Sequence, residues 1–306
     1  MQWQQIDLPE ILAPFGLRPV GLPTVLEGGE DNGNFRVTTD HGEMVVREYR
    51  KSGIEKIRAE LRLVGFLAEH GFPTPAPLPA GDEFVLEAKH PFAVFPWIEG
   101  DVPEAMTAAL AARLGALLAR MHVLTAGWID RRVPVIDRVA LLREAADSRP
   151  PLSGADAWRE RIGRFLEDHA DELDRLERLP TGPLHHDLHR QNVLVADGEV
   201  TALLDFDELN RGPLIVDVAR VLQYAALDTP DLGLPDGMDE AVLAGYEAVR
   251  PLSEAERELL PVAFDLAGLV DSAIFVAHDA ADVGVADLDE CLSWRSYLRN
   301  TRPRRP

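Results

Sequence analysis

The chain contains a single cysteine, Cys291, among its 306 residues. One cysteine excludes a disulfide within the chain, and this composition is typical of a reducing compartment. The first ten residues, MQWQQIDLPE, have neither the basic segment nor the apolar segment of a secretory leader, and no apolar run approaches the length needed to span a bilayer. We therefore expect a cytoplasmic protein.

Basic residues are also scarce. The chain has 31 Lys and Arg residues against 52 Asp and Glu residues, which gives a formal net charge of −21. Nucleic acids and anionic membranes bind basic surfaces, so we expect neither as a partner. The charge suits a cationic small molecule, although a well-solvated acidic surface explains the same balance and is the simpler interpretation.

The first hundred residues have the pattern of an antiparallel sheet with helices. Residues 8–15 predict a short helix, and residues 54–69 carry apolar side chains at helical spacing, which predicts an amphipathic helix ending at Gly71. We expect five strands in one sheet, at residues 19–26, 34–39, 44–49, 83–88 and 92–95.

Residues 185–207, HHDLHRQNVLVADGEVTALLDFD, contain three polar side chains whose spacing is informative. Asn192 follows Asp187 by five residues, and Asp205 follows Asn192 by thirteen. This spacing is typical of kinase-type phosphoryl transfer, in which one carboxylate faces an acceptor hydroxyl while an amide and a second carboxylate hold magnesium. Apolar runs on both sides of the Asp-Gly turn at 197–198 predict a β-hairpin. Such a hairpin would bring Asn192 and Asp205 to the same end.

A glycine-rich loop joins the first two predicted strands. It contains Gly28, Gly29, Asn32 and Asn34 within the segment GGEDNGN. Loops of this kind let backbone N–H groups approach phosphate oxygens closely. The segment has no Walker motif and no G-x-G-x-x-G, so a plain hairpin turn is the alternative interpretation.

Arg47 lies in the predicted strand 44–49, where the third strand of a kinase carries its phosphate-pairing Lys. Glu60 lies thirteen residues further along, in the predicted helix 54–69. We expect an Arg47–Glu60 ion pair that directs the cation toward the nucleotide. The alternative is that both are ordinary surface charges.

Beyond residue 101 the pattern changes from strands to helices. The segment 261–279 is mostly apolar yet contains Asp265, Asp271 and His278, and the last two lie seven residues apart, hence on one helical face. These side chains are candidates for binding the acceptor, and pairing with an arginine is the alternative. Residues 251–293 include ten acidic residues and one basic residue, which favours an amine-bearing acceptor. Helices are predicted at residues 105–125, 137–147, 155–179, 214–227, 238–249, 254–279 and 287–298.

The three histidines near Asp187 also allow a hydrolytic metal site. His185, His186 and His189 stand in one short loop. Imidazoles this close in sequence rarely converge on one ion, and a metal site of this kind leaves Asn192 and Asp205 unexplained. We therefore favour phosphoryl transfer.

Taken in order, these features resemble the superfamily of aminoglycoside phosphotransferases, homoserine kinases and choline kinase-like enzymes, and the type II homoserine kinases in particular. The matching segments are GGEDNGNFRV, MVVREY, VFPWIEG, HHDLHRQNVLV and LLDFDELNRGPLIVDVAR, and with their surroundings they span most of the chain. The resemblance implies an α+β, two-lobed, protein-kinase-like fold. The N-lobe, residues 1–98, would bind the nucleotide, and the mainly helical C-lobe, residues 99–306, would hold the catalytic loop and the acceptor.

The resemblance also implies roles for single residues. Asp187 would be the catalytic carboxylate that accepts or orients the acceptor hydroxyl. Asn192 and Asp205 would bind Mg²⁺, with ATP or GTP as the phosphoryl donor. Asp217, at the start of a predicted helix, would brace the catalytic loop through hydrogen bonds.

Two departures from the family pattern stand out. Arg47 replaces Lys in the third strand, and its planar fork can still bind phosphate. His189 stands where protein kinases have a Lys near the γ-phosphate, so His189 or Arg190 would supply positive charge to the transferring group. Pro96 and Trp97 lie where the family has its hinge and are candidates for contacting the nucleotide base.

The sequence therefore predicts an ATP-dependent phosphotransferase that acts on a hydroxyl of a small molecule. One acceptor class is an amino alcohol such as homoserine, and the other is a hydroxylated natural product such as an aminoglycoside or another antibiotic, which would make this a resistance enzyme. A nucleotide-binding pseudokinase is a third interpretation, against which the intact Asp187, Asn192 and Asp205 argue. We expect a monomer or homodimer.

Overall fold

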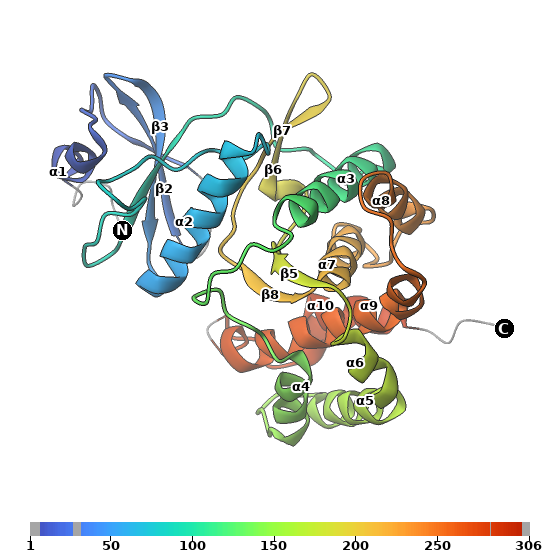
Figure 1. Cartoon of the computed structure of the whole chain (residues 1–306). Coiled ribbons are helices and arrows are strands. Elements are labelled where there is room, and N and C mark those ends of the chain that lie inside the picture. Colours follow the sequence, from blue (N-terminus) through green and yellow to red (C-terminus); the bar gives the residue numbers. More distant parts are fainter. Residues whose placement is uncertain (1–6, 27–31, 282, 302–306) are drawn as a thin grey trace. The chain divides into compact units, whose positions relative to one another are not determined.

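A computed structural model describes residues 7–26, 32–281 and 283–301 (Figure 1). The chain divides into two compact units. The first comprises the chain up to Pro103 together with Ile129–Pro134 and Gln191–Leu209, and the second comprises the rest. The fold is α+β, as predicted, with an antiparallel sheet in the first unit and mainly helices in the second. Separate roles for lobes at residues 1–98 and 99–306 stay a prediction.

The described residues of the first unit form a four-stranded sheet in the order β1–β2–β3–β4. Neighbouring strands are antiparallel: β1 (Thr24–Val25) pairs with β2 (Asn32–Thr39), which pairs with β3 (Gly42–Tyr49), which pairs with β4 (Phe92–Pro96). This arrangement places β3 in the middle of the sheet, where both of its edges are paired.

The predicted strand at residues 83–88 does not form in the described sheet. Leu86 and Phe92 exchange backbone hydrogen bonds of 2.8 and 3.0 Å, but they form only an isolated bridge. Pro91, next to Phe92, has no N–H with which to extend a ladder. Its carbonyl accepts a hydrogen bond of 2.9 Å from Tyr49 N, so it serves β3 instead.

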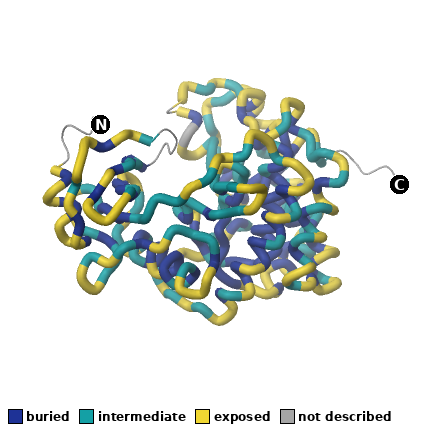
Figure 2. Tube along the Cα trace, turned by 90° about the horizontal axis from the view of Figure 1, so that it is seen from above, coloured by how far each residue is buried: buried dark blue, intermediate teal, exposed yellow. Residues whose placement is uncertain are grey.

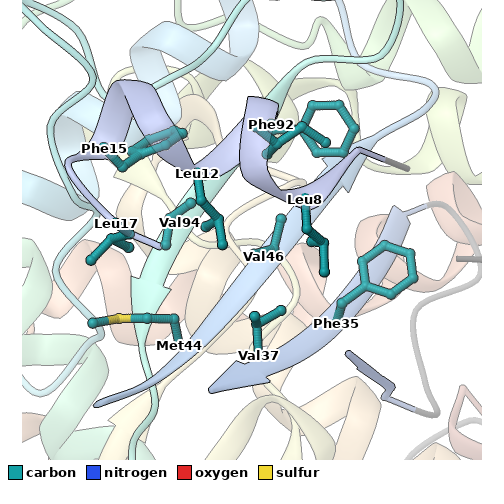
Figure 3. Packing of buried hydrophobic residues seen from close by; sticks show 11 residues of the cluster. Leu8, Leu12, Phe15, Leu17, Phe35, Val37, Met44, Val46, Phe92 and Val94 are labelled. Atoms are coloured by element: carbon teal, nitrogen blue, oxygen red, sulfur yellow. The ribbon is translucent and has the colours of Figure 1, made fainter. Parts of the chain in front are cut away.

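Each face of the sheet packs on a helical segment, because successive side chains of a strand point to opposite sides. On one face, α1 (Leu8–Leu12) and the 3-10 helix Ala13–Phe15 cover an apolar cluster that is shown in Figure 3. On the other face, α2 (Ile54–Glu69) packs through Ile57 and Leu61. The helix α2 has the predicted bounds. The cluster of the first face contains Leu8, Leu12, Phe15, Leu17, Phe35, Val37, Met44, Val46, Phe92 and Val94.

The first unit also contains the predicted hairpin, formed by β6 (Val193–Ala196) and β7 (Glu199–Leu203). Asp197 and Gly198 connect the strands, with φ values of 51° and 81°. Positive φ at both positions is what a type I′ turn requires, and this turn matches the twist of the flanking strands. The Asp-Gly dipeptide therefore specifies the hairpin locally.

The described residues of the second unit are mainly helical and include one short antiparallel pair, β5 (Thr181–Leu184) with β8 (Asn210–Pro213). Figure 2 shows its buried segments gathered in its interior and its exposed segments at loops and outer faces. The helices are α3 (Ala108–Leu124), α4 (Arg138–Asp147), α5 (Ala155–Asp168), α6 (Ala170–Leu176), α7 (Leu214–Leu227), α8 (Met238–Glu247), α9 (Glu254–Ile274) and α10 (Leu292–Asn300).

Three of the predicted helices differ in the structure, and one of them, 287–298, forms a 3-10 helix at Leu288–Glu290 followed by α10 from Leu292. The segment 155–179 is interrupted at His169, whose φ of −115° lies outside the helical range, so it forms α5 and α6. The segment 254–279 is α-helical only to Ile274 and continues as the π-helical turn Phe275–Asp279. A π-helical turn changes the angular spacing of side chains. The spacing of Asp271 and His278 therefore differs from that of a regular α-helix, and a shared face for the two stays a prediction.

The apolar length of α9 corrects the expectation that no apolar run approaches the length needed to span a bilayer. Residues 254–278 form a helix that is long and apolar enough to cross a membrane, judged by length and composition. However, 61% of its most apolar window is buried inside the protein, as in the core helix of a water-soluble protein.

Two glycines allow α3 and α8 to pack closely. A Cβ atom added at Gly115 would lie 2.1 Å from the carbonyl oxygen of Val242, and one added at Gly245 would lie 1.8 Å from that of Ala112. Neither position has room for a methyl group, because the atoms it would meet belong to backbone. The crossing of these helices thus depends on glycine at both positions.

Candidate functional site

In the first unit, one face of the sheet collects polar side chains. Arg47 and Tyr49 alternate with Val46, which faces the opposite core, and the register pairs Asn32 with Tyr49 and Asn34 with Arg47. Residues paired across an antiparallel ladder project on the same side. The four side chains therefore share the face on which α2 packs.

Arg47 is the centre of this group. Its Nη2 donates hydrogen bonds to Asp205 Oδ1 at 2.8 Å and to Asp207 Oδ2 at 2.9 Å. Asn32 Nδ2 donates to the same oxygen of Asp207. Arg47 is buried, yet its Nε has no hydrogen-bond partner among the described residues. A cation, an amide and two carboxylates are thus concentrated at one place on the sheet.

The expected Arg47–Glu60 ion pair does not form. Glu60 Oε1 instead accepts a hydrogen bond of 2.9 Å from the hydroxyl of Tyr49, while Arg47 binds the two aspartates. Burial, helped by the negative charge of Asp207, raises the pKa of Glu60 to about 8. Glu60 is therefore mostly neutral at pH 7 and has little charge with which to attract the guanidinium.

Asn192 and Asp205 flank the same end of the β6–β7 hairpin, as predicted. Asn192 O accepts a hydrogen bond of 2.8 Å from Leu204 N, next to Asp205 in the chain. Asp205 has a φ of 60°. A non-glycine residue in the left-handed region costs on the order of 1 kcal/mol, and such residues gather at functional sites.

The other candidate nucleotide contacts have mixed outcomes. Gly28 and Gly29 lie outside the described residues. Pro96 ends β4, and Trp97 N donates a hydrogen bond of 3.0 Å to Glu43 O. The indole ring lies 4.1 Å from the guanidinium carbon of Arg36. Contacts of Pro96 and Trp97 with a nucleotide base stay a prediction.

In the second unit, Asp217 holds the loop that follows β5. Its two carboxylate oxygens accept hydrogen bonds from the backbone N–H groups of His185 and His186, at 2.8 and 2.7 Å. His122 Nε2 lies 3.1 Å from one of these oxygens. Asp217 is buried at the start of α7, and the bracing role predicted for it is confirmed. His186 has a φ of 67°, in the left-handed region, and the hydrogen bond from its N–H to Asp217 helps to hold this conformation.

Asp187 follows directly in this loop. The hydroxyl of Tyr224 donates to its Oδ1, and His189 Nε2 lies 3.5 Å from its Oδ2. Burial alone would raise the pKa of Asp187, but the hydrogen bonds from His189 and Tyr224 outweigh burial and lower it to about 2. The carboxylate is therefore ionised at neutral pH.

A buried arginine connects this carboxylate to α9. Arg220 Nη2 donates to the Tyr224 hydroxyl, and its Nη1 donates to Asp271 Oδ1 at 2.9 Å. Asp271 thus pairs with an arginine, the alternative considered for it, rather than standing ready for a cationic ligand. His278 is exposed on the π-helical turn, and Asp265 is half-buried on α9. A role for these three residues in acceptor binding stays a prediction.

The remaining catalytic candidates differ in their contacts. The ring of His189 lies 4.8 Å from that of Tyr224, beside Asp187. Arg190 Nε donates to Asp228 Oδ1, just after α7. His189 therefore faces the candidate catalytic carboxylate, whereas Arg190 has an anionic partner of its own. A role in catalysis stays a prediction for both.

Sequence reasoning missed Asp207, Arg220 and Tyr224. Asp207 ends the triplet Asp-Phe-Asp, and its position two residues after Asp205 was a usable signal. Arg220 and Tyr224 follow Asp217 by three and seven residues on α7, whose only other polar residue is Gln223. This spacing places the three polar side chains on one helical face.

Comparison with known proteins identifies related sequences. A family model described as the phosphotransferase enzyme family matches residues 23–257. A homoserine kinase from Janthinobacterium sp. (strain Marseille) is 30% identical over 260 residues, which cover 84% of this chain and 78% of that protein.

Solved structures share the fold. The microcompartment-associated aminopropanol kinase matches with a TM-score of 0.64 at 21% identity, covering 94% of each chain. A spectinomycin phosphotransferase in complex with ADP and spectinomycin matches with a TM-score of 0.58 at 14% identity, covering 97% of this chain and 94% of that one. At these identities the similarity is one of fold.

Proposed function

The chain belongs to the phosphotransferase enzyme family, and we propose that it transfers the γ-phosphoryl group of ATP to a hydroxyl of a small molecule. The superfamily predicted from the motifs is confirmed by this membership. The observation that carries the proposal is the placement of Arg47 against Asp205 and Asp207. A cation beside two carboxylates offers matching partners for phosphate oxygens and for a divalent ion.

Arg47 would bind the phosphates of the donor. Its guanidinium is fixed from one side by two carboxylates, and its buried Nε keeps a donor that no described residue uses. Guanidinium groups match phosphate oxygens with two parallel donors. The ADP bound to the spectinomycin phosphotransferase supports an adenine nucleotide, with GTP as the alternative.

Magnesium would be bound by Asn192 and Asp205, whose oxygens are of the type it prefers. Among the residues that the structure describes, no three His, Cys, Asp or Glu side chains are placed to hold a metal ion. This fits an ion that takes its other ligands from nucleotide phosphates and water. Asp207 Oδ1, buried and without a hydrogen-bond partner in the described part of the chain, adds one more suitable oxygen. When bound, magnesium would neutralise charge on the phosphates.

Asp187 would orient the acceptor hydroxyl. With a pKa of about 2, it is ionised at neutral pH but is a weak base. Phosphoryl transfer proceeds mostly through a loose transition state in which the nucleophile needs positioning more than early proton removal. An acidic carboxylate that accepts a hydrogen bond from the hydroxyl suits this task.

For the acceptor, we propose an amino alcohol such as homoserine. The sequence identity to a homoserine kinase over most of both chains supports this class. An antibiotic acceptor is the second candidate, which the ten acidic residues among 251–293 favour. The pairing of Asp271 with Arg220 removes one carboxylate from that argument. A pseudokinase remains the third candidate and predicts nucleotide binding without turnover.

We also propose that the enzyme acts in the cytoplasm, as a monomer or homodimer. The single, buried cysteine supports a reducing compartment. The net charge of −21 argues against nucleic acid and anionic membranes as partners.

A panel of acceptors tests the proposal. Acceptor-dependent ADP release is measured with Mg-ATP and with Mg-GTP, against amino alcohols, choline-like amines, sugars, aminoglycosides, macrolides and spectinomycin. We expect turnover with an amino alcohol, and ³¹P NMR of the product to show a phosphate monoester. Turnover with an antibiotic alone would support the resistance role. Binding of Mg-ATP without turnover on any acceptor would support the pseudokinase, and no nucleotide binding would contradict all three.

A further inference from the structure

The hydroxyl of Tyr224 lies between a donor and an acceptor. Arg220 Nη2 donates to the phenolic oxygen, and the phenolic O–H donates to Asp187 Oδ1. A guanidinium has donors only, so the single proton of the hydroxyl cannot point back at Arg220. It is directed at Asp187, and the orientation of this hydrogen bond is set by Arg220.

Each of the three guanidinium nitrogens of Arg220 donates at least one hydrogen bond. Its Nε donates to the carbonyl oxygen of His186 at 3.1 Å, and its Nη1 donates to Gln223 Oε1 at 2.8 Å and to Asp271 Oδ1 at 2.9 Å. The side chain is 6% exposed, so these contacts are shielded from water. Asp271 balances its charge, which leaves the guanidinium fixed and compensated.

The two oxygens of Asp187 consequently have different surroundings. Oδ1 accepts the hydrogen bond from Tyr224, and Oδ2 lies 3.5 Å from His189 Nε2. A carboxylate gripped at one oxygen cannot rotate freely about its Cβ–Cγ bond. Its second oxygen is then presented in one orientation.

We propose that Tyr224 is a positioning residue, which grips Oδ1 of Asp187 so that Oδ2 faces the acceptor hydroxyl, and that Arg220 and Asp271 fix the direction of this grip. The inference rests on the proposed function for its effect on turnover. The hydrogen bond itself is testable without an acceptor. The charged and titratable groups that bear on Asp187 are His185, His189, Arg220 and Tyr224.

The first test is the titration of Asp187 in Tyr224→Phe. Selective ¹³C labelling of aspartate makes its carboxyl visible by NMR, and the Asp187→Asn variant identifies the signal. Loss of a hydrogen bond to the charged form should move the midpoint up by about one to two pH units. Tyr297→Phe is the matched control. The hydroxyl of Tyr297, on α10, also accepts a hydrogen bond from an arginine, Arg161 Nε at 2.9 Å, but it is not bonded to Asp187. An unchanged midpoint in a folded Tyr224→Phe variant would overturn the inference.

The second test is a double-mutant cycle on thermal unfolding and on turnover. If Tyr224 acts through Asp187, Tyr224→Phe should lower stability in the wild-type background and much less in an Asp187→Asn background. With an acceptor that is turned over, kcat should fall about 10- to 100-fold while KM for ATP stays unchanged. Equal effects of Tyr224→Phe in both backgrounds would overturn the inference. A wild-type protein without turnover contradicts the proposed function alone, because the titration and the unfolding cycle still decide the inference.

Discussion

Arg47 Nη2 donates a hydrogen bond of 2.8 Å to the carboxylate of Asp205, although 158 residues separate them in the chain. The pair joins the central strand of the sheet to the segment that follows the β6–β7 hairpin. It places the candidate phosphate-binding cation next to a candidate magnesium ligand.

Replacing Arg47 should remove the cation that pairs with both Asp205 and Asp207. We expect Arg47→Gln to lower stability by about 1–3 kcal/mol, because two half-buried carboxylates lose the cation that pairs with them, and to weaken Mg-ATP binding at least tenfold. Added Mg²⁺ should stabilise this variant more than the wild type, since an ion can replace the lost charge. Calorimetric titration and thermal unfolding measure both effects.

Arg36→Gln is the control for the change in stability. Arg36 lies on the neighbouring strand β2, with its side chain 39% exposed, and pairs with Glu43. An exposed pair of this kind contributes about 0–1 kcal/mol. Similar losses of stability in the two variants would contradict the stabilising role of the pairing of Arg47 with Asp205 and Asp207.

Glu60 should make stability depend on pH. Its pKa rises from 4.5 to about 8 on folding, chiefly through burial and the charge of Asp207, with Arg47, Tyr49 and Asp205 also close enough to act. The folded state holds this proton where the unfolded chain has released it. The favourable contribution is therefore full below about pH 4.5 and is lost as pH rises to about 8.

The variant Glu60→Gln checks this effect, since an amide of nearly the same shape does not titrate. We expect it to flatten the decline in stability between about pH 4.5 and 8 and to be the more stable protein above that range. Chemical unfolding at a series of pH values measures the slope. An identical slope in wild type and variant would show that Glu60 keeps an ordinary pKa.

The carboxylate of Asp217 should be indispensable to the catalytic loop. In Asp217→Asn one of the two accepting oxygens becomes an NH₂ group, which faces the backbone N–H of His185 or His186. We expect a loss of about 1–3 kcal/mol for the donor left unsatisfied, together with a lower kcat. Asp236→Asn, at an exposed position before α8, should change stability by less than about 0.5 kcal/mol.

The crossing of α3 and α8 predicts a contrast between glycines. Gly115→Ala and Gly245→Ala should each destabilise by about 3 kcal/mol or more, because the new methyl group meets backbone. Gly163 lies in α5 with no atom within 4 Å of an added Cβ. Gly163→Ala should therefore stabilise by about 0.5–1 kcal/mol. Urea unfolding of the three variants decides the point, and equal effects at all three positions would contradict the described packing.

Most features that were predicted correctly follow from short segments of the sequence. The hairpin turn at Asp197 and Gly198, the helix α2 and the brace by Asp217 follow from turn chemistry, apolar periodicity and a recognised motif. The Arg47–Glu60 pair does not form because burial raises the pKa of Glu60, which keeps it mostly neutral, and because Asp207 from a distant segment pairs with Arg47 instead. Sequence spacing does not report such competition.

Other differences between sequence and structure also come from features that local patterns do not show. The predicted strand at residues 83–88 failed at a proline, and the spacing of Asp271 and His278 is altered by a π-helical turn that no local pattern predicts. Arg220 and Tyr224 were visible in principle as polar residues on one face of α7. Their importance emerges only when the loop carrying Asp187 packs against that face.

The most direct test of the proposed function is the rate of acceptor-dependent ADP release by Asp187→Asn compared with wild type and with Asp236→Asn. We predict that Asp187→Asn loses turnover by a factor of at least about 10³ while its affinity for Mg-ATP changes little, and that Asp236→Asn keeps the wild-type rate. Turnover by Asp187→Asn at the wild-type rate would contradict the assignment of Asp187 as the catalytic carboxylate.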